Sequence, residues 1–82
     1  MKVKVFTKND DPYSQMVKNL LQSNNVEFEN IEVSRNTESF KEMVGLSGQE
    51  STPVLVIDEK VFCGFDRELI KSVLNLSKDE TE

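Results

Sequence analysis

Short alternating stretches and longer amphipathic stretches follow one another along the chain. Over Val3–Thr7, apolar residues alternate with lysines at the start, which predicts a strand. Asp11 and Pro12 predict the beginning of a helix, because aspartate accepts hydrogen bonds from the free N–H groups there and proline suits the first helical position. This helix should end near residues 23–25, and its apolar stripe is formed by Met16, Val17, Leu20 and Leu21.

A second strand and a second helix are predicted next. Val26–Val33 has the composition of a strand, but its apolar positions change phase between Phe28 and Ile31, which favours an edge strand or a bend. Asn36 can cap the following helix, and Gly48 can end it. The core-facing stripe of this helix holds Phe40, Met43, Val44 and Ser47.

The last third of the chain predicts a hairpin followed by a helix. Pro53–Ile57 is apolar throughout, as in a central strand covered on both faces, with proline at its first position. The polar turn at residues 58–60 leads into a strand over Val61–Cys63, although it lacks the glycine that such turns usually contain. Gly64 ends that strand, and Asp66 can cap a helix whose stripe is Leu69, Ile70, Val73 and Leu74.

The order of these elements is strand, helix, strand, helix, strand, strand, helix. A strand–helix–strand unit places its two strands parallel, and a hairpin adds antiparallel strands. The sequence therefore predicts an α/β domain at residues 1–76, with a four-stranded mixed sheet flanked by three helices on its two faces. A polar tail is expected at residues 77–82.

Composition and charge narrow the function classes. The 82 residues include 15 acidic and 10 basic residues, for a net charge of −5, which disfavours nucleic acid and anionic membrane surfaces as partners. The chain has no apolar run of membrane-spanning length and no signal-peptide pattern, so a cytoplasmic monomer is expected. One cysteine and no histidine exclude an internal disulfide and predict no metal site.

Several segments, taken together in their order, carry a resemblance to a known family. They are Val5-Phe6-Thr7-Lys8 before Pro12-Tyr13, then Val26-Glu27-Phe28, Gly48-Gln49 before Thr52-Pro53-Val54, and Gly64-Phe65-Asp66 with Glu68-Leu69-Ile70. The chain resembles the glutaredoxin family of the thioredoxin fold from Val3 to about Asn75. This resemblance implies a thioredoxin-like βαβαββα fold and the chemistry of a glutathione-dependent disulfide oxidoreductase.

The active-site motif of that family is changed here. Where the family has Cys-Pro-Tyr-Cys, this chain has Asp11-Pro12-Tyr13-Ser14. The first cysteine acts as a thiolate that attacks a disulfide sulfur, and a second thiol or glutathione resolves the mixed disulfide. A carboxylate and a protonated hydroxyl perform neither step, so the dithiol activity should be lost. Members with a single cysteine that hold an iron–sulfur cluster also use a cysteine at position 11, which disfavours that role.

Three interpretations of Asp11 are open at this point. It can be a helix cap, which contributes about 0.5 to 2 kcal/mol to stability. It can be a permanent mimic of the thiolate charge that holds a cationic or donor-rich partner. Together with Ser14, it can also be a replacement of two cysteines that the natural gene encodes.

The resemblance also implies a binding groove. Thr52-Pro53 matches the cis-proline of the family, which places backbone groups beside the active-site loop to pair with glutathione or an extended peptide. Lys8 matches a lysine that meets one carboxylate of glutathione, and Gly64-Phe65-Asp66 matches the helix start that receives the other. Tyr13 could flank this groove. The acidic pair at positions 10 and 11 opposes an anionic tripeptide, so glutathione and a client peptide are both candidate ligands and no cofactor is firmly implied.

Cys63 is the remaining thiol. It shares a face of the predicted last strand with Val61, and we expect a small buried apolar side chain there rather than a nucleophile. The favoured function is therefore a redox-inactive binding or regulatory module that keeps the groove. The alternative is a thiol-disulfide oxidoreductase, either with its natural cysteines replaced or with weak monothiol activity through Cys63.

Overall fold

The computed structural model describes residues 2–74 and contains the predicted elements in the predicted order. The end of the predicted domain at residues 75–76 and the predicted tail at residues 77–82 lie outside this part of the chain. In residues 2–74, no helix is long and apolar enough to cross a membrane. The elements are β1 (Val3–Thr7), α1 (Pro12–Ser23), β2 (Glu29–Glu32), α2 (Thr37–Ser47), β3 (Val54–Ile57), β4 (Lys60–Cys63) and α3 (Arg67–Val73).

The strands form one mixed sheet in the order β2-β1-β3-β4. β1 pairs with β2 in parallel, with Val5 opposite Asn30, and with β3 antiparallel, with Val5 opposite Leu55. β3 and β4 form the predicted antiparallel hairpin. This arrangement confirms the predicted thioredoxin-like α/β fold, with β2 at one edge of the sheet as its phase change suggested.

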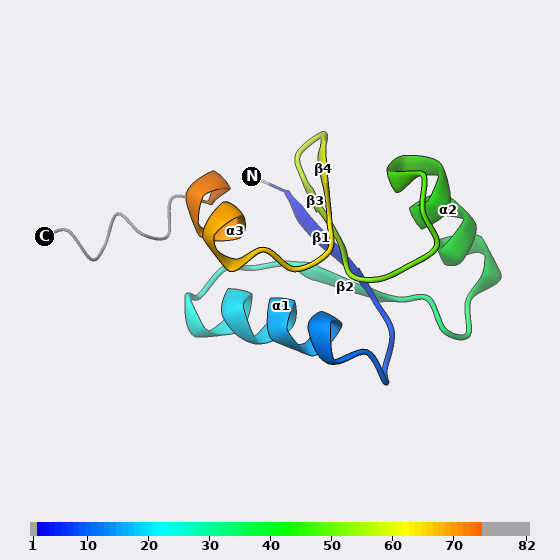
Figure 1. Cartoon of the computed structure of the whole chain (residues 1–82), viewed down its shortest axis with the longest axis horizontal. Helices are drawn as coiled ribbons and strands as arrows, with labels where there is room; N and C mark the ends of the chain where they lie inside the picture. The colour runs from blue at the N-terminus through cyan, green and yellow to red at the C-terminus, as the bar shows by residue number, and fades with distance from the viewer. Residues whose placement is uncertain (1, 75–82) are drawn as a thin grey trace, which may run out of the picture.

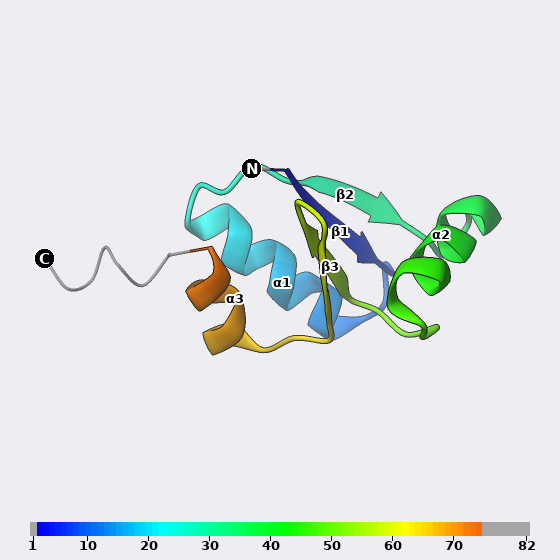
Figure 2. The same ribbon diagram turned by 90° about the horizontal axis from the view of Figure 1, so that it is seen from above.

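Helices cover both faces of the sheet. α1 and α3 lie on one side and α2 lies on the other (Figure 1). Turning the molecule by 90° shows the same separation of α2 from the other two helices (Figure 2). The larger apolar cluster lies under α1 and α3 and includes Val5, Leu21, Leu55 and Ile70. The smaller cluster lies under α2 and includes Phe6, Met43 and Val54.

Each helix begins at a side chain that accepts a hydrogen bond from the first turn. Asp11 accepts from the Tyr13 amide, Asn36 from the Ser39 amide and Asp66 from the Leu69 amide, as the sequence predicts. Gly48 ends α2 with φ 74°, a left-handed conformation that glycine adopts without a steric cost. The Asp11 cap fixes the start of α1 at Pro12, directly after the loop that follows β1.

The second strand is shorter than predicted. The expected strand over Val26–Val33 is paired only from Glu29 to Glu32, opposite Lys4 to Thr7 of β1, and the same register would place Val26 and Glu27 beyond the start of β1. Its side chains still explain the phase change. Val26 and Phe28 pack toward α1 and α3, whereas Ile31 and Val33 pack toward α2, so both faces of this segment are used.

The hairpin forms without a glycine in its turn. Asp58 takes the left-handed conformation, with φ 56°, that glycine usually provides. Its amide donates to the Lys2 carbonyl oxygen at 2.7 Å, and its carboxylate accepts from the Lys2 amide at 2.9 Å. The start of the chain and the hairpin turn therefore stabilise each other.

Two residues that the helical stripes assigned to the core lie at the surface. Met16 is 43% exposed and Leu69 is 42% exposed, whereas their neighbours Val17 and Ile70 are buried. An apolar stripe broader than the contact with the sheet leaves its flanking members uncovered. The prediction of a core position was therefore wrong for both.

Candidate functional site

The candidate site lies where β1 ends, α1 begins and β3 begins. The loop between β1 and α1 is closed by a hydrogen bond from the Asp11 amide to the Lys8 carbonyl oxygen at 3.3 Å. It is also held to β2, because the Asn9 amide donates to Glu32 Oε2 at 3.0 Å. Asp11 is therefore presented on an anchored loop at the N-terminus of α1.

The Asp11 carboxylate accepts three hydrogen bonds from its own protein. Oδ1 accepts from the Tyr13 amide at 3.1 Å, which is the helix cap. Oδ2 accepts from Ser14 Oγ at 2.9 Å and from the Thr52 hydroxyl. The bond from Thr52 joins α1 to the segment before β3 across 41 positions in the sequence. The cap is thus also a connection between two parts of the site.

These contacts determine the charge of Asp11. Burial raises the pKa of this carboxyl group, but hydrogen bonds from Thr52 and Ser14 and from the Tyr13 and Ser14 backbones oppose it, and the net pKa lies below its ordinary value. Asp11 is therefore ionised at neutral pH. Its negative charge lies at the position that the resemblance matches to the first cysteine of the glutaredoxin motif, and hydrogen-bond donors are bound to both of its oxygens.

Ser14 is fully buried in the first turn of α1. Its hydroxyl donates to Asp11 and accepts from the Lys8 amide at 3.3 Å. Among residues 2–74, no buried side-chain nitrogen or oxygen lacks a partner, so this hydroxyl fits its site without an unpaired atom. Ser14 contributes to the structure of the loop and has no access to a substrate.

Five predicted groove residues come together around one cavity of about 310 Å³: Tyr13, Thr52, Pro53, Gly64 and Phe65. The peptide bond between Thr52 and Pro53 is cis. The Gly64 amide donates to the Pro53 carbonyl oxygen at 2.9 Å, and the φ of 79° at Gly64 is a conformation that favours glycine. The turn after β4 is thereby fixed against the segment that precedes β3.

Two other predicted ligand residues do not line this cavity. Lys8 lies on a separate cavity of about 400 Å³, which is also lined by Val33, Ser34, Arg35, Asn36, Thr37 and Phe40. Asp66 uses its carboxylate to cap α3. Arg35 is a basic neighbour of Lys8 that the sequence did not single out, because the two are brought together only by the parallel pairing of β1 with β2.

Cys63 is exposed, so the expectation of a buried side chain was wrong. It is the last residue of β4, an edge strand, and it pairs with Val54 on β3. On the same face of β4, Val61 packs against the apolar cluster under α2, but this packing does not extend to Cys63 at the end of the strand. The thiol therefore lies at the surface, one residue before Gly64 of the groove.

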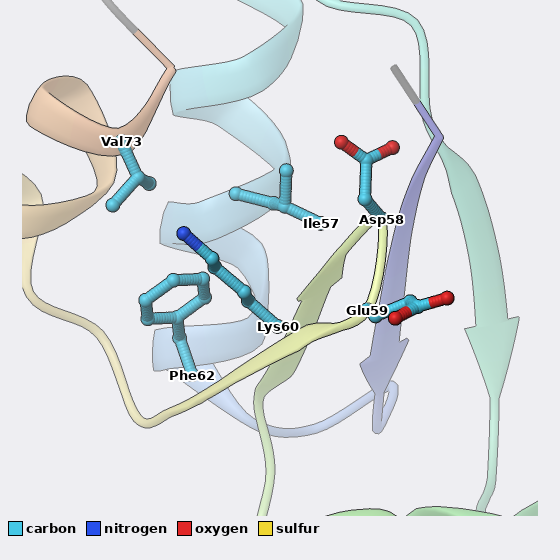
Figure 3. Close-up of a pocket in the computed structure, with 6 residues that line it drawn as sticks. All are labelled: Ile57, Asp58, Glu59, Lys60, Phe62 and Val73. Carbon is cyan, nitrogen blue, oxygen red and sulfur yellow. The ribbon is translucent and has the colours of Figure 1, made fainter.

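A larger cavity, of about 830 Å³, is lined by none of these groups (Figure 3). It lies between the β3–β4 turn and α3. Ile57, Phe62 and Val73 form its apolar part, and Lys60 points toward α3, whereas Asp58 and Glu59 point away. Because none of the predicted site residues lines it, we assign the candidate site to the smaller groove.

Within residues 2–74, no group of three or more acidic or cysteine side chains is arranged to bind a metal ion. The site instead presents an anchored carboxylate, a mostly apolar groove and a nearby exposed thiol. The carboxylate can hold donors and the groove can hold a side chain or a peptide.

Comparison with known proteins agrees with this geometry. A family model described as glutaredoxin matches residues 3–62. Glutaredoxin 3 of Escherichia coli K12 is 33% identical over 64 residues, which cover 78% of this chain and 77% of that protein. A glutaredoxin-like 8.6 kDa protein from the rubredoxin operon of Clostridium pasteurianum is 28% identical over 72 residues, covering 88% of this chain and 96% of that one.

A solved structure shows the same arrangement. The crystal structure of a mutant of the thioredoxin-like protein BC3987 superposes with a TM-score of 0.86 at 32% identity, covering 92% of this chain and 96% of that one. The match of the family model extends from β1 through most of β4 and therefore includes the loop with Asp11 and the groove residues Thr52 and Pro53. The chain belongs to the glutaredoxin family.

Proposed function

We propose that this glutaredoxin-family protein has lost dithiol redox activity and acts as a binding or regulatory module through the groove beside Asp11. The observation that carries the proposal is the set of three hydrogen bonds that the Asp11 carboxylate accepts from Tyr13, Ser14 and Thr52. The position that would attack a disulfide is occupied by a group that cannot form a reducible bond. Its hydrogen bonds serve to hold the groove together.

The chemistry of disulfide exchange explains why the change matters. A thiolate displaces one sulfur of a disulfide and forms a mixed disulfide, which a second thiol then resolves. A carboxylate has no such intermediate available. A buried hydroxyl, such as that of Ser14, stays protonated and has no route to a mixed disulfide. What this site retains is a shaped and charged surface.

An extended segment of a client protein is the ligand class that this surface supports best. The groove is lined by Pro53 and by two aromatic residues, of which Tyr13 is 58% exposed. Such surfaces bind apolar side chains while nearby polar groups orient the backbone. Glutathione is supported less well, because Lys8 lies on a different cavity and Asp11 adds a negative charge at the groove.

A coupled assay and a titration test this proposal. The protein at micromolar concentration should not accelerate the reduction of a glutathionylated substrate by glutathione, while an authentic dithiol glutaredoxin does so in the same assay. Amide shifts in an NMR titration with reduced glutathione then report on ligand choice at Lys8, Thr52 and Gly64. Disulfide reduction well above background would refute the proposal of a redox-inactive module.

One observation favours a second candidate function, monothiol oxidoreductase activity. The Cys63 thiol is exposed beside the groove residue Gly64. As a thiolate it could attack a glutathionylated client, releasing the client thiol and forming a disulfide between Cys63 and glutathione. A second glutathione would then restore Cys63 and leave as glutathione disulfide. Activity of the wild type that disappears in Cys63→Ser would establish this candidate.

A cytoplasmic location and a monomeric state belong to the proposal as well. A chain with one cysteine has no internal disulfide to form in an oxidising compartment. If the natural gene encodes cysteine at positions 11 and 14, the natural protein is instead an ordinary dithiol member of the family. Sequencing the gene at those two codons separates these cases.

A further inference from the structure

We propose that the groove continues along α1 into a second pocket, and that the two together bind an extended apolar segment of a client protein whose acidic residue is recognised by Arg67. This inference rests on the proposed function, because it names the partner class of the same site. It adds a binding pocket and a charged contact on the far side of Phe65.

The second pocket adjoins the first. It has a volume of about 280 Å³ and is lined by Met16, Asn19, Leu20, Ser23, Phe65 and Arg67. Phe65 also lines the groove with Tyr13 and Pro53. Since the Phe65 side chain borders both cavities, they lie next to each other along α1 and the segment that follows β4. We call this surface the α1 trough.

Exposed apolar side chains form one wall of the α1 trough. Tyr13 and Met16 are three residues apart on α1 and therefore occupy the same face in adjacent turns. They are 58% and 43% exposed. Single exposed apolar residues are common, but here the two border neighbouring pockets that share a phenylalanine, which is the arrangement of a binding surface.

The wall of the trough along α1 is about as long as three residues of an extended chain. From Tyr13 to Leu20 there are seven helical steps, or about 10 Å at a rise of about 1.5 Å per residue. An extended segment advances about 3.3 Å per residue, so side chains two positions apart are about 6.6 Å apart. Alternate side chains of a bound segment can thus enter the two pockets.

Arg67 gives the trough its charge preference. Its side chain is exposed, and within residues 2–74 its guanidinium makes no ion pair or hydrogen bond. The preceding carboxylate, that of Asp66, is engaged with the Leu69 amide. A carboxylate on the client would therefore supply the missing partner, and arginine binds carboxylates through two parallel hydrogen bonds.

The probe for this proposal is a displayed library of random eight-residue peptides without cysteine, selected on the wild-type protein. Enriched peptides should share two apolar residues separated by one position and an acidic residue on one side of them. The tightest peptide is then labelled, and its affinity is measured by fluorescence anisotropy at low and high salt. The absence of cysteine from the library excludes capture through Cys63.

Two variants and two matched controls locate the binding. Met16→Ser should weaken the labelled peptide about fivefold, and Arg67→Glu about tenfold, with the effect of Arg67→Glu reduced at high salt. Leu46→Ser removes an apolar residue that is similarly exposed, at 45%, and Lys41→Glu reverses an exposed charge, both on α2. These controls should leave the affinity within about twofold. A glutamate at the first position of α3 suits the helix dipole, so Arg67→Glu should stay folded.

The outcomes separate this inference from the function on which it rests. Peptides that bind the Met16 and Arg67 variants as tightly as the wild type would overturn the α1 trough and leave a module that uses only the groove. A library with no enriched peptide would overturn both proposals. Disulfide reduction in the coupled assay would overturn the redox-inactive function, whatever the peptides do.

Discussion

Replacing Asp11 by alanine should destabilise the protein by more than the loss of an ordinary surface carboxylate. The substitution removes the cap from the Tyr13 amide and the shared acceptor of two hydroxyl groups, those of Ser14 and Thr52. Ser14 is fully buried, so water cannot readily replace the lost acceptor there, whereas Thr52 is half-buried and can turn to solvent. The two hydroxyls therefore contribute unequally.

The magnitude follows from these contacts. Loss of a helix cap costs about 0.5 to 2 kcal/mol. Leaving a buried hydroxyl donor without an acceptor costs about 1 to 3 kcal/mol, although the Ser14 hydroxyl can rotate and reduce this cost. A total of about 2 to 3 kcal/mol is expected for Asp11→Ala. In a domain of this size, about 1 kcal/mol corresponds to a shift in Tm of about 4 to 8 °C.

Urea unfolding followed by circular dichroism measures this difference, with Asp10→Ala as the matched control. Asp10 is the adjacent exposed aspartate and has no hydrogen bond within residues 2–74, so its replacement removes the same charge without the contacts. Asp10→Ala should change the free energy of unfolding by less than about 0.5 kcal/mol. Equal effects of the two variants would show that Asp11 acts only through its charge, and the account of the site given above would be wrong.

Further predictions concern pH, restored chemistry and the remaining thiol. Burial raises the pKa of Asp11, but its hydrogen bonds lower the pKa by more, so the folded-state pKa lies below the unfolded-state value of about 3.9. The stabilisation of the fold by ionised Asp11 should therefore be complete above the unfolded-state pKa and be lost as pH falls through the folded-state pKa. The stability difference between wild type and Asp11→Asn, from urea unfolding, should therefore be constant from about pH 7 to 5 and shrink below about pH 4. The double variant Asp11→Cys/Ser14→Cys should gain disulfide reduction in the coupled assay, since the helix N-terminus that lowers a thiol pKa is present; a folded but inactive product would contradict this. Cys63→Ser should alter the free energy of unfolding by less than about 0.5 kcal/mol because the thiol is exposed, and a larger loss would indicate a packing role.

Much of the fold is predictable because local signals agree with the global arrangement. Asp11, Asn36 and Asp66 each precede a stretch of helical period and each caps a helix. The uninterrupted apolar run of β3 predicts its central place, and all four of its residues are buried. The phase change after Phe28 correctly indicates an edge strand. The paired length of β2 depends on its register with β1, and the sequence of residues 26–33 alone does not determine that register.

The candidate site is less predictable, because it depends on contacts between distant segments. The family resemblance gives the groove residues, and five of them do share a cavity. The hydroxyl contact of Thr52 with Asp11 joins residues 41 positions apart, and no local pattern announces it. Strand alternation and helical period predict core positions for Cys63 and Met16. Both side chains lie outside the surface that neighbouring helices and strands cover, and only the tertiary packing determines which surface is covered.

Aspartate and serine at the two motif positions explain each other. A serine alone at position 14 would bury a hydroxyl donor, and Asp11 supplies its acceptor at 2.9 Å. The same oxygen accepts from Thr52, beside the groove that includes Pro53. The two residues therefore place no thiol at the start of α1, and Asp11 joins α1 to the groove residue Thr52. This connection supports the proposal that the protein uses the shape of the groove rather than dithiol redox chemistry.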